Sequence, residues 1–126
     1  MANKKIQTDF APKAIGPYSQ AIDTGNLVFV SGQIPLDPKT MEVVGQTIEE
    51  QTTQVMKNLE AILQEANLTF ANVIKFTIYL TDLADFDQLN QTYAQFLTEP
   101  YPARATIEVS KLPKDVKVEI DLIAKR

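Results

Sequence analysis

Two segments near the C-terminus constrain the fold most strongly, because each alternates apolar and polar side chains with the period of a β-strand. In residues 103–109 the odd positions are small or apolar, and the even positions are Arg104, Thr106 and Glu108. In residues 116–124 the even positions are apolar, and Glu119 and Asp121 lie opposite them. This period predicts two strands that each bury one face and present charge on the other. Arg104 and Glu119 are therefore the first candidates for a functional pair.

The rest of the chain predicts further strands and two amphipathic helices. Strands are expected at residues 4–8, 17–23, 27–31 and 73–80, the last with Ile74, Phe76, Ile78 and Leu80 on one face. Helices are expected from Thr47 to about residue 66 and over residues 85–97. The element order is then β-β-β-α-β-α-β-β, and two helices can cover only one face of such a sheet, which predicts an α+β layered domain.

The helix from Thr47 carries the clearest local signals. Thr47 and Glu50 fit a capping box, in which the hydroxyl and the carboxylate satisfy amides of the first turn. Asn67 is the expected C-cap residue, with Leu68 folding back onto the last turn. The helix is expected to bury a stripe of apolar residues: Ile48, Val55, Leu59, Ile62, Leu63 and Ala66. For residues 85–97 the expected apolar side is Phe86, Leu89, Tyr93, Phe96 and Leu97.

The sheet face away from the helices has a mixed character. It is predicted to carry Lys75, Thr77, Tyr79, Arg104, Thr106 and Glu119, together with Leu27 and Phe29. Such a face can be solvated or can pack against copies of itself. We favour self-association, with functional clefts where subunits meet.

Composition narrows the function classes. A length of 126 residues predicts one domain, residues 1–126. No apolar run reaches the roughly 18 residues that span a bilayer, and no signal-peptide pattern opens the chain, so a cytoplasmic protein with no membrane partner is expected. The chain has no Cys and no His, which excludes a His/Cys zinc site and any Ser-His or Cys-His nucleophile pair. The net charge of −4 disfavours a nucleic-acid partner.

Each candidate residue also has an ordinary structural interpretation. Arg104 suits a carboxylate ligand, because guanidinium forms two parallel hydrogen bonds with it, but it also suits pairing with a neighbouring Glu. Glu119 is flanked by Val118 and Ile120 and suits proton transfer or water positioning, yet exposed strand carboxylates are more common. Tyr18 and Ser31 present hydroxyls where strands begin and end, which is equally typical of turn chemistry and strand termination.

Two further signals are weak. Asn90 lies one helical turn before Tyr93, a position at which most Asn residues are simply exposed. The glycines Gly16, Gly25, Gly32 and Gly45 do not have the spacing of a phosphate-binding loop, so a nucleotide site is not expected.

Taken together, five motifs resemble the RidA (YjgF) family of reactive-intermediate deaminases. They occur in order and together make the resemblance specific over about residues 6–124: residues 16–21 (GPYSQA), 30–35 (VSGQIP), 90–93 (NQTY), 102–104 (PAR) and 112–120 (LPKDVKVEI). The resemblance implies a chorismate mutase-like (Bacillus-type) α+β fold, a mixed sheet with two helices on one face, and a homotrimer with a central barrel and sites between subunits. It also implies hydrolysis of 2-imino acids and their enamine tautomers, such as 2-iminobutanoate and 2-iminopropanoate, to 2-keto acids and ammonia. No cofactor and no metal are expected.

The resemblance also assigns roles to individual residues. Arg104 matches the carboxylate-binding Arg, and Glu119 the acidic residue that orients water. Tyr18 and Ser31 match hydroxyl-bearing residues that line the site, and Asn90 a helix residue that reaches the same cleft. A backbone contact with substrate is implied at position 107, and the departure there is that many relatives carry Cys where this chain has Ile107.

A second departure is the loop before Pro102, which is shorter than in many members. Because that loop borders the cleft in the family, the difference is expected to affect substrate preference. The main alternative function is a non-enzymatic trimer that binds metabolites, regulates a partner or acts like a chaperone. RNA cleavage is a second alternative, which the acidic balance and the absence of His disfavour.

Overall fold

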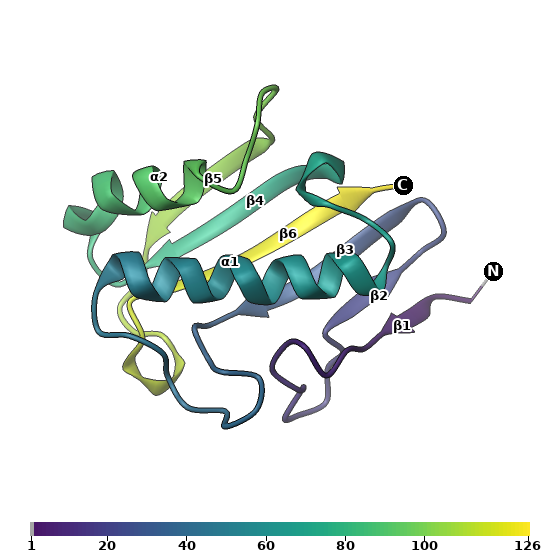
Figure 1. Ribbon diagram of the computed structural model, residues 1–126, viewed down its shortest axis with the longest axis horizontal. Helices are drawn as coiled ribbons and strands as arrows, with labels where there is room; N and C mark the ends of the chain where they lie inside the picture. Colours follow the sequence, from purple (N-terminus) through teal and green to yellow (C-terminus); the bar gives the residue numbers. More distant parts are fainter. Residues whose placement is uncertain (1) are drawn as a thin grey trace.

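The structure is a computed structural model that describes residues 2–126, and its elements follow the predicted order of strands and helices (Figure 1). The strands are β1 (Lys4–Ile6), β2 (Ala21–Asp23), β3 (Leu27–Gln33), β4 (Val73–Leu80), β5 (Ala103–Glu108) and β6 (Val118–Lys125). The helices are α1 (Ile48–Glu65) and α2 (Phe86–Ala94), with short 3-10 turns η1 (Phe70–Asn72), η2 (Leu83–Asp85) and η3 (Pro113–Asp115).

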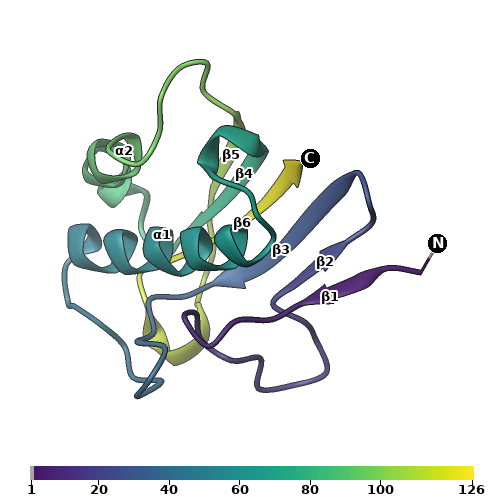
Figure 2. The same ribbon diagram turned by 45° about the vertical axis from the view of Figure 1, so that its right-hand side comes forward.

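Within residues 2–126 the six strands form one mixed sheet in the order β1-β2-β3-β6-β4-β5. The last strand, β6, lies in the middle of the sheet and is antiparallel to both β3 and β4. The side chains at its even positions, from Val118 to Ala124, are almost entirely buried, as expected for a central strand. The parallel pair is β4 and β5, which α2 connects, as a parallel pair needs a crossover. Both helices lie on the same face of the sheet, which confirms the predicted layers (Figures 1 and 2).

Helix α1 begins and ends as its sequence predicts. The Thr47 side chain accepts from the Glu50 backbone amide at 3.1 Å, and the Glu50 carboxylate accepts from the Thr47 amide at 3.2 Å, so the capping box is present. The C-cap is Ala66 rather than Asn67, which follows it in the left-handed conformation with φ of 62°. Leu68 then donates its amide to the Leu63 carbonyl, closing the last turn. The predicted apolar stripe of α1 is buried against the sheet.

The core between the helices and the sheet includes an aromatic cluster under α2. Phe76 of β4 lies edge-on to Tyr93 of α2, with ring centroids 5.2 Å apart. Phe70 contacts both Phe76 and Phe96 at centroid distances of 6.1 Å. These tilted and edge-on arrangements are the favoured geometries for aromatic pairs. They anchor α2, and with it the edge of the sheet that α2 covers.

Three elements are shorter than the sequence predicted. The strand expected at 17–23 covers only β2, because residues 16–18 turn and the Tyr18 amide donates to the Gly16 carbonyl. The strand expected at 4–8 ends at Ile6. The helix expected at 85–97 ends at Ala94, after which residues 95–97 continue in tighter i→i+3 turns.

The expected face of Ile74 was wrong. Its side chain is 45% exposed, whereas Val73 before it is buried. The register of β4 against β6 shifts between Val73 and Lys75, and this irregularity reverses the alternation at the start of the strand. From Phe76 onward the predicted alternation holds.

The predicted face of Arg104 and Thr106 was also wrong. In β5, Arg104 is paired with Phe76 of β4, and Thr106 with Ile78, both of which face the helices. Arg104 therefore lies on the helix-bearing face. β5 is an edge strand whose side chains are all half-buried or exposed, so either face can accept polar residues there. The period-two pattern was correct, but its assignment to the faces was reversed.

The helix-free face is broad and partly apolar. Phe29, which is 44% exposed, lies beside Ile22 and Ile123 in the register of the sheet, and the same row continues through Lys75 to Ala103. The next polar rows contain Asp121 and Glu119. Within residues 2–126, no helix combines the length and the apolar character that a membrane crossing requires.

Candidate functional site

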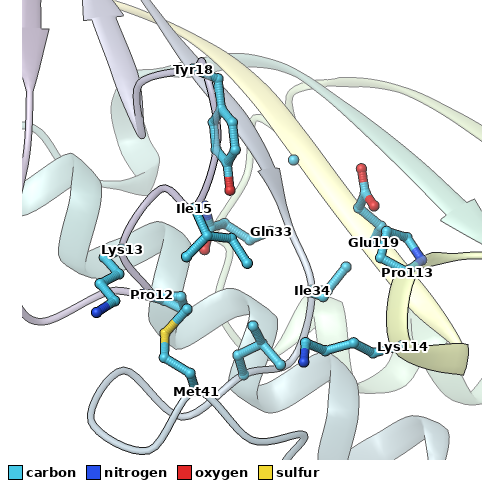
Figure 3. A pocket seen from close by; sticks show the side chains of 12 residues that line it. Pro12, Lys13, Ile15, Tyr18, Gln33, Ile34, Met41, Pro113, Lys114 and Glu119 are labelled. Carbon is cyan, nitrogen blue, oxygen red and sulfur yellow. The ribbon is translucent and has the colours of Figure 1, made fainter.

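A pocket of about 260 Å³ opens where β3 and β6 end among loops (Figure 3). Glu119 of β6 and Tyr18 of the loop before β2 enter it from different elements, and Figure 3 shows the Tyr18 ring directed into the pocket. The remaining lining is mostly apolar: Pro12, Lys13, Ile15, Gly32, Gln33, Ile34, Leu36, Met41, Pro113 and Lys114. The pocket therefore combines a carboxylate and a phenol with a largely apolar wall, as small-molecule sites usually do.

Glu119 is half-buried at the edge of this pocket. Burial raises the pKa of the Glu119 carboxyl above its ordinary value, and the nearby Asp121 carboxylate raises it further. Gly32 makes this position accessible, because a Cβ on residue 32 would overlap the carboxylate oxygen Oε2 of Glu119. The register of β3 against β6 is irregular between Val30 and Gln33, which brings the Gly32 backbone close to the carboxylate. The result is a carboxyl group with increased affinity for a proton, facing a pocket.

Ser31 lies behind the pocket rather than in its lining. Its hydroxyl donates to the Ser19 carbonyl at 2.6 Å, and its backbone amide donates to the Gln20 carbonyl at 2.9 Å. Ser31 thus ties β3 to the segment that carries Tyr18. Its hydroxyl proton is already donated to Ser19. In this position Ser31 holds the backbone next to Tyr18 and does not line the pocket.

Arg104 and Asn90 are brought together on the other side of the sheet. The Arg104 guanidinium donates through Nη1 to Oδ1 of Asn90 at 2.5 Å. The guanidinium carbon also lies 5.3 Å from the ring centroids of both Phe86 and Tyr93. These rings and the amide hold the guanidinium in place while Arg104 stays exposed. Among residues 2–126 its side chain donates to Asn90 alone, so its remaining donors can bind an anionic partner. A pocket of about 380 Å³ beside it is lined by Asn90, Tyr93, Ala94, Tyr101, Pro102 and Arg104.

The two rings around Arg104 were not predicted as functional residues. Phe86, Asn90 and Tyr93 follow one another at spacings of four and three, so they share one face of α2. The sequence places Phe86 and Tyr93 on the apolar, core-facing side of this helix, which is the usual meaning of apolar residues at that spacing. Burial raises the pKa of Tyr93 to about 12, although the nearby Arg104 charge acts in the opposite direction. Tyr93 is therefore neutral at physiological pH and acts as a ring rather than as an acid.

Ile107 lies on the helix-free face, in a row with Tyr79 and Glu119 of the neighbouring strands. Its side chain is exposed. In the same region the Tyr79 hydroxyl donates to Oδ2 of Asp121 at 3.1 Å. Burial and the two carboxylates, Asp121 and Glu119, raise the pKa of Tyr79. Tyr79 and Asp121 are polar neighbours of the candidate site that the sequence did not single out.

Within one chain the candidate residues form two half-sites rather than one. Glu119 and Tyr18 define a carboxylate half-site at the first pocket, and Arg104 and Asn90 define a guanidinium half-site at the second. β4 lies between β5 and β6, and Arg104 and Glu119 project from opposite faces of the sheet. Among residues 2–126, no group of three or more His, Cys, Asp or Glu side chains is arranged to hold a metal ion.

Concave pockets with a few polar groups among apolar side chains, such as the two on this α+β sheet, are typical of proteins that bind small molecules. The sequence profile of the Endoribonuclease L-PSP family matches residues 8–126. The chain belongs to that family, in which proteins named RidA and RutC are found, and the predicted RidA resemblance is confirmed.

Individual relatives match over nearly the whole chain. A RutC family protein of Pyrococcus abyssi is 52% identical and covers 98% of both chains. A 2-iminobutanoate/2-iminopropanoate deaminase of Salmonella typhimurium is 46% identical, again over 98% of both chains. Among solved structures, E. coli TdcF with bound serine is similar with a TM-score of 0.93 and 45% identity, covering 98% of each chain.

Proposed function

We propose that this protein hydrolyses 2-imino acids and their enamine tautomers, such as 2-iminobutanoate and 2-iminopropanoate, to 2-keto acids and ammonia. The observation that carries the proposal is the half-buried Glu119 carboxyl, with its raised pKa, at a pocket that also contains a phenol. A protein that only bound a carboxylate would need the guanidinium but no group suited to proton transfer. Relatives that are 46% identical are named for this deaminase activity, which supports the same chemistry here.

The active site is proposed to form between copies of the chain. Arg104 and Glu119 project from opposite faces of one sheet, so one substrate can meet both only if each comes from a different copy. The partly apolar helix-free face, with Phe29 exposed, provides a surface for that association. We propose a homotrimer in which each cleft joins the guanidinium half-site of one copy to the carboxylate half-site of the next. Because such a ring is closed, no half-site is left without its partner.

In this cleft the Arg104 guanidinium binds the substrate carboxylate. Asn90 takes one guanidinium donor, and the Phe86 and Tyr93 rings restrict the plane of the group, leaving its outer edge for two parallel hydrogen bonds. Fixing the carboxylate fixes C2 of the imine beside it. This is a positioning role that lowers the entropic cost of water attack.

Glu119 handles the water and its proton. The carboxylate accepts a proton as the water oxygen bonds to C2 of the protonated imine, forming a tetrahedral carbon that carries hydroxyl and amine. The same proton then passes from Glu119 to the nitrogen, and the C2–N bond breaks with its electron pair leaving on ammonia. The regenerated Glu119 carboxylate takes the hydroxyl proton as the carbonyl forms, and passes it to the departing ammonia, which leaves as ammonium. The raised pKa of Glu119 suits a group that both accepts and donates this proton.

The remaining candidates support this arrangement. Tyr18 offers a hydroxyl near the reacting carbon, and Ser31 holds the segment from which Tyr18 projects. Ile107 lies in the same row as Glu119 and Tyr79, where its backbone and exposed side chain border the cleft of an assembled protein. Its branched side chain is proposed to change the shape of that cleft without removing a reacting group. The cytoplasm is the proposed compartment.

A metabolite-binding or regulatory role is the alternative, and it has one supporting observation. The similar TdcF structure contains bound serine. A guanidinium placed as that of Arg104 is here could bind the carboxylate of such an amino acid. RNA cleavage, which the family's description names, has less support here, because the chain has no His and a net charge of −4.

A coupled assay tests the proposal directly. A pyridoxal-phosphate-dependent dehydratase generates the imine from threonine or serine, and its decay is followed with and without the purified protein. We expect the wild-type chain to accelerate decay, and Arg104→Ala to abolish that effect while the assembly stays intact. Unchanged imine decay with wild-type protein would reject the enzyme assignment, whereas full activity in Arg104→Ala would reject the site.

A further inference from the structure

The loop between β1 and β2 supplies much of the wall of the Glu119 pocket without any regular secondary structure. Pro12, Lys13, Ile15 and Tyr18 all line the pocket, and all lie between Ile6 and Ala21, where the chain forms only turns and bends. Helices and strands hold their backbone through repeating hydrogen bonds, but a loop needs other groups to do so. The position of Tyr18 therefore depends on what fixes this loop.

The side chain of Gln20 is the group that fixes it. Its Oε1 accepts from the Thr8 amide at 2.8 Å. Its Nε2 lies within hydrogen-bond distance of three carbonyls: those of Pro12 at 2.8 Å, Thr8 at 3.1 Å and Ala11 at 3.3 Å. Gln20 is only 2% exposed, and Ala11 beside it is also buried. A buried amide that uses both its donor and acceptor ends is costly to replace, because its partners lose their bonds away from water.

These bonds close a loop at its base. Pro12 and Gln20 are eight residues apart along the chain, and the bond from Nε2 to the Pro12 carbonyl brings the two together. Lys13, Ile15 and Tyr18 lie within the closed segment. Closing a loop restricts the conformations of every residue inside it, so the amide limits where the Tyr18 ring can stand.

The same residue connects the loop to the sheet. The Gln20 carbonyl accepts from the Ser31 amide at 2.9 Å, and the Ser31 hydroxyl donates to the adjacent Ser19 carbonyl at 2.6 Å. Ser31 is directly followed by Gly32, whose backbone lies against the Glu119 carboxylate. One path of bonds therefore runs from the Tyr18 loop through Gln20 to the strand segment beside Glu119.

We propose that Gln20 is a positioning residue: its buried amide closes the 12–20 loop and so sets the place of Tyr18 relative to Glu119. The inference refines the proposed imine hydrolysis and rests on it for its kinetic consequence, but its structural part stands on the contacts alone. Gln20 itself need not touch the substrate.

The kinetic test compares Gln20→Met with a matched control. Gln20→Met keeps the length of the side chain and removes every hydrogen bond it makes. Asn72→Ala is the control, because it removes the capping box of η1 and a bond to the Lys125 carbonyl, far from the pocket, and so destabilises the protein without touching the loop. We expect kcat/KM for imine hydrolysis to fall about tenfold in Gln20→Met and to stay within about twofold of wild type in Asn72→Ala.

Gln20→Glu gives a second test of the same contacts. A buried carboxylate at this position faces three carbonyl oxygens, so only its protonated form can donate, and its pKa should be raised. We expect the ratio of kcat/KM in Gln20→Glu to that in wild type to rise as the pH falls. Taking the ratio at each pH removes the effect of titrating Glu119. A ratio that is flat with pH would contradict the proposed role.

A structural readout separates this inference from the proposed activity. The chain has no Trp, so Tyr18→Trp introduces a single tryptophan at the loop, which can be excited selectively at wavelengths where the remaining tyrosines do not absorb. We expect Gln20→Met, added to Tyr18→Trp, to lower the emission anisotropy and increase acrylamide quenching, and Asn72→Ala to change neither. If wild type hydrolyses no imine, this readout still decides the inference. Unchanged anisotropy and quenching would overturn the inference. If wild type is active, a kcat/KM in Gln20→Met equal to that of the control would overturn it as well.

Discussion

At the scale of single residues, the raised pKa of Glu119 predicts that its ionised carboxylate serves activity but lowers the stability of the fold. A carboxyl with a folded-state pKa above its unfolded value is destabilising once ionised, so its favourable contribution is present at low pH and is lost as the pH rises through the folded pKa. We expect Glu119→Gln to slow turnover strongly, to keep substrate binding, and to raise the thermal unfolding midpoint at pH 7.

The pH dependence provides the control for that prediction. Below the ordinary Glu pKa of 4.5, wild-type Glu119 is protonated in both states, so the stability gain of Glu119→Gln should vanish there. Thermal unfolding of both proteins at pH 4 and pH 7, together with imine turnover, checks this. A gain that is equal at both pH values would mean that burial of the charge is not its cause.

Asn90 gives a second prediction at this scale. Asn90→Ala removes the acceptor that holds one side of the Arg104 guanidinium, while the Phe86 and Tyr93 rings remain. A less ordered guanidinium should bind the substrate carboxylate more weakly, so we expect kcat/KM to fall about tenfold, mainly through KM. Gln88→Ala, an exposed position on the same helix, is the control and should leave both constants unchanged. A loss confined to kcat would place Asn90 at the reacting atoms instead.

At the scale of elements, the capping box of α1 predicts a defined stability cost. Thr47→Ala leaves the Glu50 amide without its acceptor and should reduce the free energy of unfolding by about 1 kcal/mol, with the urea m-value unchanged. Thr53→Ala removes a hydroxyl that bonds only to the Glu49 carbonyl within the helix, and should cost little. Urea unfolding of the three proteins checks both values. Equal losses in the two variants would show that the cap is not what stabilises the helix.

The end of β3 makes the opposite prediction, loss of activity without loss of the fold. A Cβ in Gly32→Ala would overlap the Glu119 carboxylate and displace it from the pocket, so we expect turnover to fall by at least about tenfold. Gly25→Ala is the contrasting variant: with φ of 101° it strains the β2–β3 turn but meets no atom, so it should lose stability and keep its activity. Paired measurements of kcat/KM and thermal midpoint test this. Normal turnover in Gly32→Ala would remove Glu119 from the proposed role.

At the scale of the whole molecule, the separation of the two half-sites predicts complementation between defective copies. Arg104→Ala lacks the guanidinium half-site and Glu119→Gln lacks the carboxylate half-site, so Arg104→Ala alone should be inactive and Glu119→Gln alone should turn over only slowly. Mixed at equal amounts under conditions of subunit exchange, they should recover about one quarter of the wild-type activity, because a random cleft joins two intact half-sites with that frequency. Each variant exchanged with itself is the control. No recovery despite proven exchange would contradict a site shared between copies.

The helix-free face predicts that assembly and activity depend on each other. Phe29→Asp places a charge directly between Ile22 and Ile123, the apolar centre of its row, which should oppose burial of that face. We expect the variant to sediment more slowly than wild type, as a smaller assembly, to keep its secondary structure and to lose imine hydrolysis. Activity that persists in a monomer would show that one chain suffices. Sedimentation velocity and circular dichroism on the same sample measure both.

The sequence by itself determined the elements and the residue types available for chemistry. The Thr47 capping box, the apolar stripe of α1 and the alternation of β6 are local patterns, and each appeared as predicted because neighbours along the chain specify it. The two charged candidates, Arg104 and Glu119, could also be selected from sequence, since they stood out against small or apolar neighbours and formed part of the five motifs. The roles of the candidate residues stay predictions.

Only the tertiary structure decided which side of the sheet each candidate occupies. Alternation states that Arg104 and Ala105 point in opposite directions, but not which of them faces the helices; the parallel pairing of β5 with β4 fixed that, and it reversed the prediction. Likewise, the aromatic rings around Arg104, the contact between Gly32 and Glu119, and the hydrogen bonds of the Gln20 side chain join residues from different segments of the chain. The alternation of side chains in a strand is determined by residues within that segment, whereas a site depends on how separate segments pack against one another.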